Sequence, residues 1–470
     1  MDIKKTTYEI LPSANLYSPE EVSSFIEEKI ENKGYRELKS FISDMHAPDI
    51  AELFYDFATG HQMLLFRLLP KELAAEVFTL LDADTQRRLI DNVTDTELSE
   101  MLDELEIDDT VGFLEEMPAV VVKRILRSAS HEDRVAINAI LRYPKYSAGS
   151  IMTTEYIRFL SGMNVGEALL HIRRVGRERE DIHTGYVTDE NRRILGVVTV
   201  RDLLISEPET ALVEIMDDMV ILASTHDDRE EVSYRLNKYG LYSMPVADSE
   251  GRLVGVITLD DALDVIKEES EEDFAKMAAL TPVDKPYLKT SVISLFFSRI
   301  PWLLFLMLTS TLSSAILSGF EGALPAVLLL FVPMIMGTGG NSGGQSSVTV
   351  TRAISLGEIE FSDTGKVFFK ELRVGAMCAL ALSTVTFVKV LLIDMLLLGN
   401  SAITITIALV ISLSLGATVL AAKMIGATLP ILAKKIGLDP AVMASPLITT
   451  LVDAISLVVY FLVARSILTF

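Results

Sequence analysis

The sequence predicts a multidomain protein: an all-α superhelical N-terminal domain, an α/β domain made of a tandem repeat, a connecting helix, and a transmembrane domain of five helices. Three observations predict this order. Of the 65 acidic residues, 57 lie in residues 1–285, so that part carries 31 − 57 = −26 and the rest 11 − 8 = +3, which sum to −23. A strand-and-helix pattern recurs after 59 positions within residues 150–268. The remaining chain holds five apolar stretches of about 20 residues, the length that crosses a bilayer.

The N-terminal domain, expected over residues 18–145, should consist of short amphipathic helices with explicit caps. Thr94 and Glu97 have capping-box spacing ahead of an apolar helix face. The acidic balance favours cations as partners and argues against nucleic acid. The lone Cys378 excludes a disulfide framework and a cysteine metal site, and the six histidines form no ligand or catalytic motif. We therefore expect no enzyme.

The tandem repeat is expected as two units, residues 146–208 and 209–268. The segment Arg193–Leu204 recurs as Arg252–Leu263, each with the pattern G-h-h-T-x-x-D, in which h is apolar. This pattern resembles a pair of CBS domains, whose Thr and Asp contact ribose or phosphate when an adenine nucleotide binds. Many CBS pairs bind no nucleotide, so ATP remains one alternative, with Thr199, Arg201, Asp202 and Thr258 as its candidate contacts.

The connecting region, residues 269–292, begins within a run of carboxylates that includes Glu268, Glu269, Glu271, Glu272 and Asp273. Such a run usually forms a solvated helix face. Crowded like charges repel one another until a divalent cation neutralises them. The run therefore suggests a switch that is compact with the ion and splayed without it.

The transmembrane domain is expected over residues 293–470. If the acidic part is inside, the loops at 319–323 and 398–401 face out and contain no Lys or Arg. The inner loops would hold the basic residues Arg352, Lys366, Lys370, Arg373, Lys423, Lys434 and Lys435, in line with the positive-inside rule. Lys389 is expected near the outer end, where it can snorkel. This topology predicts a multi-pass protein of the plasma membrane with cytoplasmic N-terminal domains and an external C-terminus.

Polar residues inside the spans point to a cation path. The second span contains the glycine-rich tract Pro333–Ser347, which a lipid-facing helix would not favour. In the last span Thr449, Asp453 and Ser456 fall on one helix face. A lone carboxylate at mid-bilayer costs about 2.5 to 3.5 kcal/mol, so it needs a partner. Hydroxyls, amides, carbonyls and a carboxylate suit hard cations such as Mg²⁺ or Ca²⁺, and they do not settle which.

Nearly all of residues 18–470 resembles the MgtE family of magnesium transporters. The membrane tract matches P-x-x-x-G-x-x-G-N-x-G-x-Q at Pro333, Gly337, Gly340, Asn341, Gly343 and Gln345. The resemblance implies a homodimeric Mg²⁺ channel whose pore uses Asp453 and the carbonyl of Thr449, with Asn341 either touching hydrated Mg²⁺ or holding helices together. It implies cytosolic Mg²⁺ sensor sites at Glu76, Asp108, Asp228, Glu230, Asp261, Asp264, Glu269, Glu272 and Asp273.

Three positions depart from the family pattern. Two sensor carboxylates fall on Gly112 and Gly240, which predicts weaker or redistributed sensing. At the ATP position Arg201 and Asp202 match, whereas the aromatic stacking position falls on Leu241.

The expected function is passive Mg²⁺ entry for magnesium homeostasis, driven by the membrane potential and closed by cytosolic Mg²⁺. The chain has no G-x-x-x-x-G-K-[ST] loop, so ATP-driven pumping is not supported. One alternative is a proton- or sodium-coupled exporter of divalent cations. Another is a membrane-anchored CBS nucleotide sensor that carries no ion.

Overall fold

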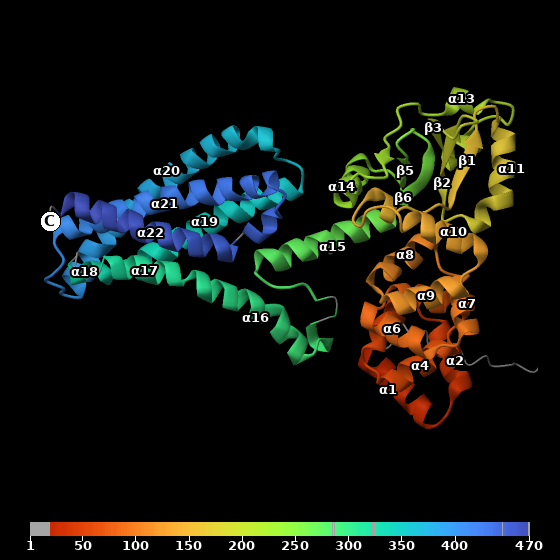
Figure 1. Cartoon of the computed structure of the whole chain (residues 1–470), viewed down its shortest axis with the longest axis horizontal. Helices are drawn as coiled ribbons and strands as arrows, with labels where there is room; N and C mark the ends of the chain where they lie inside the picture. The colour runs from red at the N-terminus through yellow and green to blue at the C-terminus, as the bar shows by residue number, and fades with distance from the viewer. Residues whose placement is uncertain (1–18, 284, 286, 321–324, 444, 469–470) are drawn as a thin grey trace, which may run out of the picture. The chain divides into compact units, whose positions relative to one another are not determined.

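The computed structural model describes residues 19–470 except 284, 286, 321–324, 444 and 469–470 (Figure 1). The chain forms two compact units. The first comprises Met1–Ile266 with Asp284–Lys289, and the second comprises Lys267–Val283 with Thr290–Phe470.

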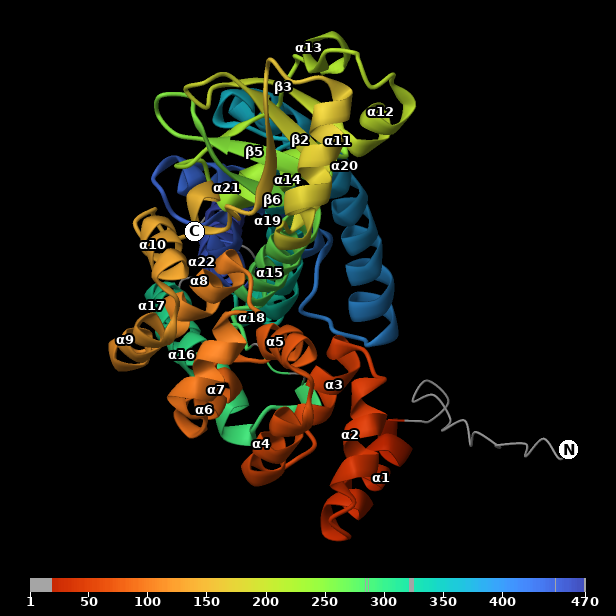
Figure 2. The same cartoon turned by 90° about the vertical axis from the view of Figure 1, so that its right-hand side faces the viewer.

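The N-terminal part of the first unit is a succession of short helices, as the sequence predicts (Figures 1 and 2). Contacts between helices that are not neighbours in sequence build much of its core; Phe78 of α5 and Phe113 of α8, for example, meet edge to face with ring centroids 5.2 Å apart. Polar ties reinforce the stack, since the Arg124 guanidinium donates to the carbonyl of Val93 and to Asp95. The helices are α1 (Pro19–Glu31), α2 (Tyr35–Ser43), α3 (Ala47–Phe54), α4 (Thr59–Leu68), α5 (Lys71–Thr79), α6 (Ala83–Asn92), α7 (Asp95–Leu102), α8 (Ile107–Glu116), α9 (Ala119–Ser128) and α10 (His131–Ile140).

The two repeats form two three-stranded sheets of the same topology, with the first pair of strands parallel and the second antiparallel. Helix α11 covers the first sheet through Val165 and Ala168, which share a core with Phe159 (Figure 2). The strands are β1 (Tyr156–Leu160), β2 (Asp181–Thr188), β3 (Ile194–Thr199), β4 (Ala223–Ser224), β5 (Ser243–Ala247) and β6 (Leu253–Thr258). The helices are α11 (Val165–Val175), α12 (Val200–Ile205), α13 (Leu212–Ile215) and α14 (Arg229–Tyr239).

The repeats interlock through equivalent contacts. Each last strand pairs with the segment that leads into the other repeat, at Val197–Asp217 and at Thr153–Val256. A glycine permits each approach: a Cβ on Gly255 would lie 2.6 Å from the Met152 sulfur, and Gly196 is just as crowded. No larger residue fits there without displacing the neighbouring segment.

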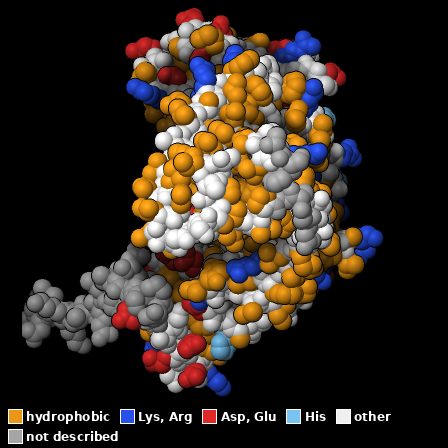
Figure 3. Space-filling view, turned by 90° about the vertical axis from the view of Figure 1, so that its left-hand side faces the viewer, with side chains coloured by type: hydrophobic (Ala, Val, Ile, Leu, Met, Phe, Trp, Pro, Cys, Tyr) orange, Lys and Arg blue, Asp and Glu red, His pale blue; other side chains and the backbone are white. Residues whose placement is uncertain are grey.

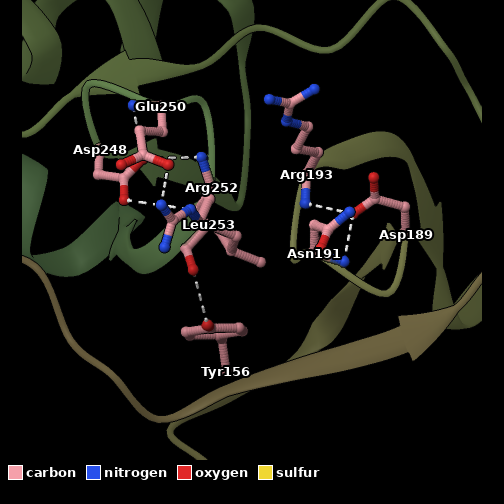
Figure 4. A network of polar contacts seen from close by, with 8 residues as sticks. All are labelled: Tyr156, Asp189, Asn191, Arg193, Asp248, Glu250, Arg252 and Leu253. Carbon is pink, nitrogen blue, oxygen red and sulfur yellow. Dashed lines mark hydrogen bonds and ion pairs between the residues drawn. The ribbon is translucent and has the colours of Figure 1, made fainter.

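The turns before β3 and β6 repeat the same local chemistry (Figure 4). Asp189 accepts hydrogen bonds from the backbone N–H of Asn191 and Arg193, and Asp248 accepts them from Glu250 and Arg252. These are Asx turns, in which a side chain closes the loop in place of a backbone carbonyl. The turns meet where Arg193 pairs with Arg252.

The connecting helix α15 (Leu259–Met277) begins inside the second repeat and ends earlier than the predicted region of 269–292. It stops at a left-handed Ala279, with φ of 52°, and Pro282 follows. A short helical turn, Tyr287–Lys289, precedes the first span. Lys285 pairs with Asp82 at 3.2 Å within the first unit.

The second unit contains five helical segments long and apolar enough to cross a membrane, which confirms the predicted number for the described residues. Hydrophobic side chains gather over much of the face in Figure 3, and large ones such as Leu308, Met377 and Leu380 are exposed. The elements are α16 (Val292–Thr309), α17 (Thr311–Gly319), α18 (Ala326–Leu329), α19 (Val332–Ser355), α20 (Thr364–Lys389) with a π-helical end (Val390–Leu397), α21 (Ile405–Lys435) and α22 (Ser445–Ile467).

One lysine differs from its predicted position, and a second has an unexpected partner. Lys423, expected in an inner loop, lies inside α21 and is only 5% exposed, because the helix continues to Lys435. Lys389, expected near the outer end of its span, is the last residue of α20, and its ammonium pairs with Asp394 at 2.7 Å in the π-helical segment that follows. Both charges are therefore held by protein groups.

Helix α19 is packed between α21 and α22 by its glycines. A Cβ on Gly339 would lie 2.6 Å from the Ser456 hydroxyl, and one on Gly426 of α21 would lie 2.2 Å from the Gly343 carbonyl oxygen. Small residues let membrane helices approach closely in this way. The glycine-rich tract is thus partly a packing surface, with its other face left open.

Candidate functional site

A cluster of carboxylates joins three segments of the first unit. Oxygens of Glu106, Asp108 and Glu180 lie within 4.8 Å of one another, and those of Glu180, Asp260 and Asp261 do likewise. We call these residues, together with Asp109, the acidic cluster. They come from the start of α8, the residue before β2, and the first turn of α15.

Helix starts place the acids at the cluster. Asp108 lies in the first turn of α8 and Asp261 in the first turn of α15, where the helix dipole favours negative charge. The hydroxyl of Thr258 donates to Asp261. Asp108 is 8% exposed, and among the described residues nothing donates to its Oδ1. Glu180 Oε2 is buried without a described donor as well. Buried carboxylate oxygens of this kind need a cation or a proton.

Burial and mutual repulsion raise the pKa values across the cluster. Burial first, then neighbouring acids, brings the pKa of Glu106 to about 7, that of Glu180 to about 8 and that of Asp261 to about 6. The pKa of Asp108 is raised well above its ordinary value for the same reasons. Without a metal, several of these groups hold protons near neutral pH. A divalent cation would displace those protons, and an oxygen-only donor set suits Mg²⁺ or Ca²⁺.

The structure brings together only some of the predicted sensor residues. Asp108 and Asp261 meet in the acidic cluster, and Asp264 is near enough to raise the pKa of Asp109. Glu76 is exposed on α5. Asp228 caps α14 by accepting from the backbone N–H groups of Glu230 and Glu231.

Four cluster residues were missed from the sequence: Glu106, Asp109, Glu180 and Asp260. Doubled acids at 108–109 and 260–261 were a usable signal. Glu180 carried none, because only the fold brings it beside Asp108.

Gly112 and Gly240, which stand where the family pattern has carboxylates, lie in different local surroundings. Gly112 lies one turn after Asp108, and a Cβ added there would meet nothing within 4 Å. Gly240 ends α14 in the left-handed conformation, with φ of 63°. Glycine is favoured at such a helix end because it has no Cβ. A carboxylate would therefore fit at 112 and be strained at 240.

The nucleotide candidates fall at equivalent places in the two repeats. Thr199 and Asp202 form a capping box at the start of α12, and Arg201 is exposed beside them. Thr258 holds Asp261, which is surrounded by the acidic cluster and would repel phosphate. Leu241, at the position expected for an aromatic stacking residue, has no ring to stack on an adenine base.

Within the second unit, polar contacts hold the end of α15 against other residues of that unit. Lys276 lies 2.6 Å from Asp439 and 2.7 Å from Glu272, while Ser355 of α19 donates to Asp273 at 2.7 Å. Burial would lower the pKa of Lys276, but its hydrogen bonds with the two carboxylates outweigh burial and raise it. Burial raises the pKa of Asp273. Glu269, also on α15, is half-buried.

A polar stripe runs along the open face of α19, formed by Gly337, Asn341 and Gln345 at intervals of four residues. All three are exposed in the single chain. Asp453 and Thr449 of α22 lie beside this helix: a Cβ on Gly340 would be 2.8 Å from Thr449 Cγ2 and 3.6 Å from Asp453 Oδ1. The three predicted pore residues are thus carried on two neighbouring helices.

Buried hydroxyls lie on α21 and α22, the two helices between which α19 is packed. Ser414, Thr418 and Ser456 are at most 1% exposed and have no hydrogen-bond partner in the described chain, nor does Asp453 Oδ1. Hydroxyls in helices often donate to the preceding turn, as Thr450 does to Pro446. Ser414 and Thr418 were not predicted, because small polar residues in a span resemble packing surface. Together they give the interior behind the stripe a polar lining.

Comparisons with known proteins cover nearly the whole chain. Residues 332–463 match the family model described as a divalent cation transporter, residues 45–146 match the MgtE intracellular N domain, and residues 148–208 and 212–268 match the CBS domain. The chain is 35% identical over 455 residues to the magnesium transporter MgtE of Thermus thermophilus, which covers 96% of this chain and 99% of that protein. It is 30% identical to MgtE of Bacillus subtilis, covering 92% and 94%.

Among solved structures, the chain is similar to the cytosolic domain of the Mg²⁺ channel MgtE in complex with ATP. The identity is 34% and the TM-score 0.50, over 52% of this chain and all of that one. The helical domain, the paired repeats and the five apolar helices agree with the predicted fold class.

Proposed function

Because the chain belongs to the MgtE family of magnesium transporters, we propose that it carries Mg²⁺ across the membrane and closes when cytosolic Mg²⁺ occupies the acidic cluster. The observation that carries the proposal is the polar stripe of α19 beside the carboxylate of Asp453, inside a unit otherwise built for lipid. Relatives named as magnesium transporters match the chain from end to end, which supports the choice of ion. Transport without enzymatic chemistry agrees with them.

The path suits an ion that keeps part of its water. Mg²⁺ dehydrates reluctantly and binds through few carboxylates and several waters. Asp453 supplies the one charge, the carbonyl of Thr449 a second oxygen, and Asn341 a carboxamide that can hydrogen-bond a bound water. Gly337 exposes backbone along the same stripe. These contacts are weak and multiple, which allows an ion to enter and leave.

The path requires a second copy of the chain. The polar stripe is exposed along one side of the membrane unit, and such a surface facing lipid would be strongly unfavourable. Two copies related by a twofold axis would enclose both stripes and both Asp453 carboxylates. We therefore propose a homodimer in the plasma-membrane bilayer.

The membrane potential supplies the driving force. A potential of 100 mV provides about 2.3 kcal/mol per charge, hence about 4.6 kcal/mol for a divalent cation. The direction follows from the distribution of basic residues, which puts the acidic first unit in the cytoplasm and the C-terminus outside.

Closure by Mg²⁺ would use the acidic cluster. An ion held by Asp108, Glu180 and Asp261 ties α8 and the segment before β2 to α15, which continues toward the first span. When cytosolic Mg²⁺ falls, repulsion between the bare carboxylates would loosen these segments. Asp264, Glu269, Glu272 and Asp273 extend the acidic surface along the same helix.

ATP, if it binds, belongs in the first repeat. Thr199 and Asp202 can contact ribose, and Arg201 offers the positive charge that phosphate requires. The similar cytosolic domain solved with ATP supports a nucleotide on this module. Thr258 is the less suitable contact because of the acids around it.

Purified protein in liposomes tests the function directly. With a fluorescent Mg²⁺ indicator inside, an imposed inside-negative potential should accelerate Mg²⁺ entry, and internal Mg²⁺ should then slow it. Flux that follows an imposed proton or sodium gradient and ignores the potential would instead establish a coupled exporter. Nucleotide binding without any ion flux would establish a sensor.

A further inference from the structure

A charged network in the membrane unit, buried at Lys423 and Ser346 and half-buried at Glu371, joins three spans. The ammonium of Lys423 on α21 donates to the Ser346 hydroxyl at 3.3 Å, and that hydroxyl donates to Glu371 of α20 at 2.7 Å. Lys423 is 5% exposed and Ser346 is 3% exposed. Opposite charges on two spans are therefore bridged by one hydroxyl on a third.

Such a network is costly to place in a membrane and asks for a role. A charged side chain at depth is tolerated when it pairs within the bundle. Removing one partner of a buried pair is strongly destabilising, whereas replacing both can be nearly neutral. The role of Lys423 and Glu371 is therefore tested by replacing both residues together as well as one alone.

Ser346 lies at an informative place on α19. It directly follows Gln345 of the polar stripe, and it is three residues beyond Gly343 of the packing face. Between residues 339 and 344 the buried positions of that face are glycines apart from Ser342, and glycines bring backbones close but offer no side chains to interlock with neighbouring helices. Glycine contacts alone leave the rotation of α19 about its axis weakly specified.

We propose that Lys423 and Glu371 are positioning residues for the ion path. Their hydrogen bonds with Ser346 come from two neighbouring helices and fix the rotation of α19 about its axis. That rotation orients Asn341 and Gln345 toward the ion path. Neither residue touches the ion. The inference about rotation stands on the network itself, and its effect on ion flux rests on the proposed function.

A labelling experiment measures the rotation without any transport. The full-length protein carries Gln345→Cys in a Cys378→Ser background, and reaction with a membrane-impermeant maleimide is followed in liposomes. Lys423→Met leaves Glu371 unbalanced and should change the labelling rate about tenfold, equal to about 1.4 kcal/mol. Lys423→Met with Glu371→Gln should return the rate to within about twofold. Thr428→Val is the matched control, because its hydroxyl bonds only within α21.

Ion flux provides the second measurement. Ser346→Ala, which removes the bridge without leaving a new charge in the chain, should shift the Mg²⁺ concentration for half-maximal flux and the preference for Mg²⁺ over Mn²⁺ about fivefold, or about 1 kcal/mol. An unchanged labelling rate in folded Lys423→Met and Ser346→Ala proteins overturns the proposal. If Lys423→Met fails to fold, Ser346→Ala alone decides it. Absence of Mg²⁺ flux in the unmodified protein would refute the proposed function and leave the labelling result to judge this inference.

Discussion

Two regions of this molecule suit the same ion with opposite chemistry. The acidic cluster gathers six carboxylates at a junction of segments, whereas the path along α19 has one carboxylate among hydroxyls, amides and backbone. A site with many carboxylates holds a cation tightly, and its carboxylates repel one another when the cation is absent. One charge makes a site that an ion can leave. The contrast suggests that the soluble region measures magnesium and the membrane region passes it.

The strongest test removes the single charge of the path. Asp453→Asn should reduce Mg²⁺ flux in liposomes about a hundredfold, equal to about 2.8 kcal/mol of lost ion stabilisation. Glu358→Gln, on the loop after α19, is the matched control and should conduct normally. Normal flux in Asp453→Asn would place the path elsewhere and end the comparison.

Removing two charges from the cluster should spare the flux and change its regulation. Asp108→Asn with Asp261→Asn should raise the cytosolic Mg²⁺ needed for half-closure about tenfold. Glu76→Gln, an exposed acid outside the cluster, should shift it less than twofold. If Glu76→Gln has the larger effect, sensing is not centred on the acidic cluster.

Changes in pH should alter the stability that the acidic cluster contributes, because its carboxyl groups have raised pKa values. The folded pKa values of Glu180, about 8, and Asp261, about 6, lie above their ordinary values, so the folded state binds more protons than the unfolded state between about pH 4 and 8. Without Mg²⁺, stability contributed by these groups is full below about pH 4 and is lost as pH rises through the folded pKa values.

Mg²⁺ needs the deprotonated carboxylates, so its stabilising effect should grow over the same range. Thermal unfolding of the full-length protein at pH 6 and pH 8, with and without Mg²⁺, measures both trends. Stability that rises with pH in the absence of Mg²⁺ would contradict the protonated cluster.

The smallest expected effect adds a charge. Gly112→Asp places a carboxylate one turn after Asp108 in open space and should lower the closing Mg²⁺ concentration about threefold, or about 0.6 kcal/mol. Gly112→Ala controls for the loss of glycine. A higher closing concentration in Gly112→Asp than in Gly112→Ala would show that repulsion dominates there.

Local patterns predicted much of this molecule. Hydropathy located five spans because lipid demands long apolar helices, and the 59-residue spacing located the paired sheets because each repeat carries its own strand and cap signals. The ends of individual helices were harder to predict from the sequence. Helix α15 ends at Met277 because the chain turns at Ala279, and the composition around Ala279 does not indicate that turn.

The candidate sites depend more on contacts that only the fold creates. Glu180 lies beside Asp108 in the fold although the two are 72 positions apart in sequence, and no residue pattern near Glu180 indicates an ion site. Lys423 ended an apolar run and therefore resembled a loop residue, yet α21 continues for three more turns and buries it. Resemblance to a family supplied Asp108 and the sensor role of Asp261, whereas the residue pattern of the last span by itself pointed to Asp453.

The duplicated fold has one further consequence. The position that carries Arg201 in the first repeat carries Asp260 in the second, 59 residues later. Equivalent positions of the two repeats therefore carry opposite charges, while the bridges between the repeats keep both in one module. If an anion and a divalent cation each bind their copy, thermodynamic reciprocity requires any influence of one on the other to act equally in both directions. The repeat would then couple the energy state of the cell to its magnesium content.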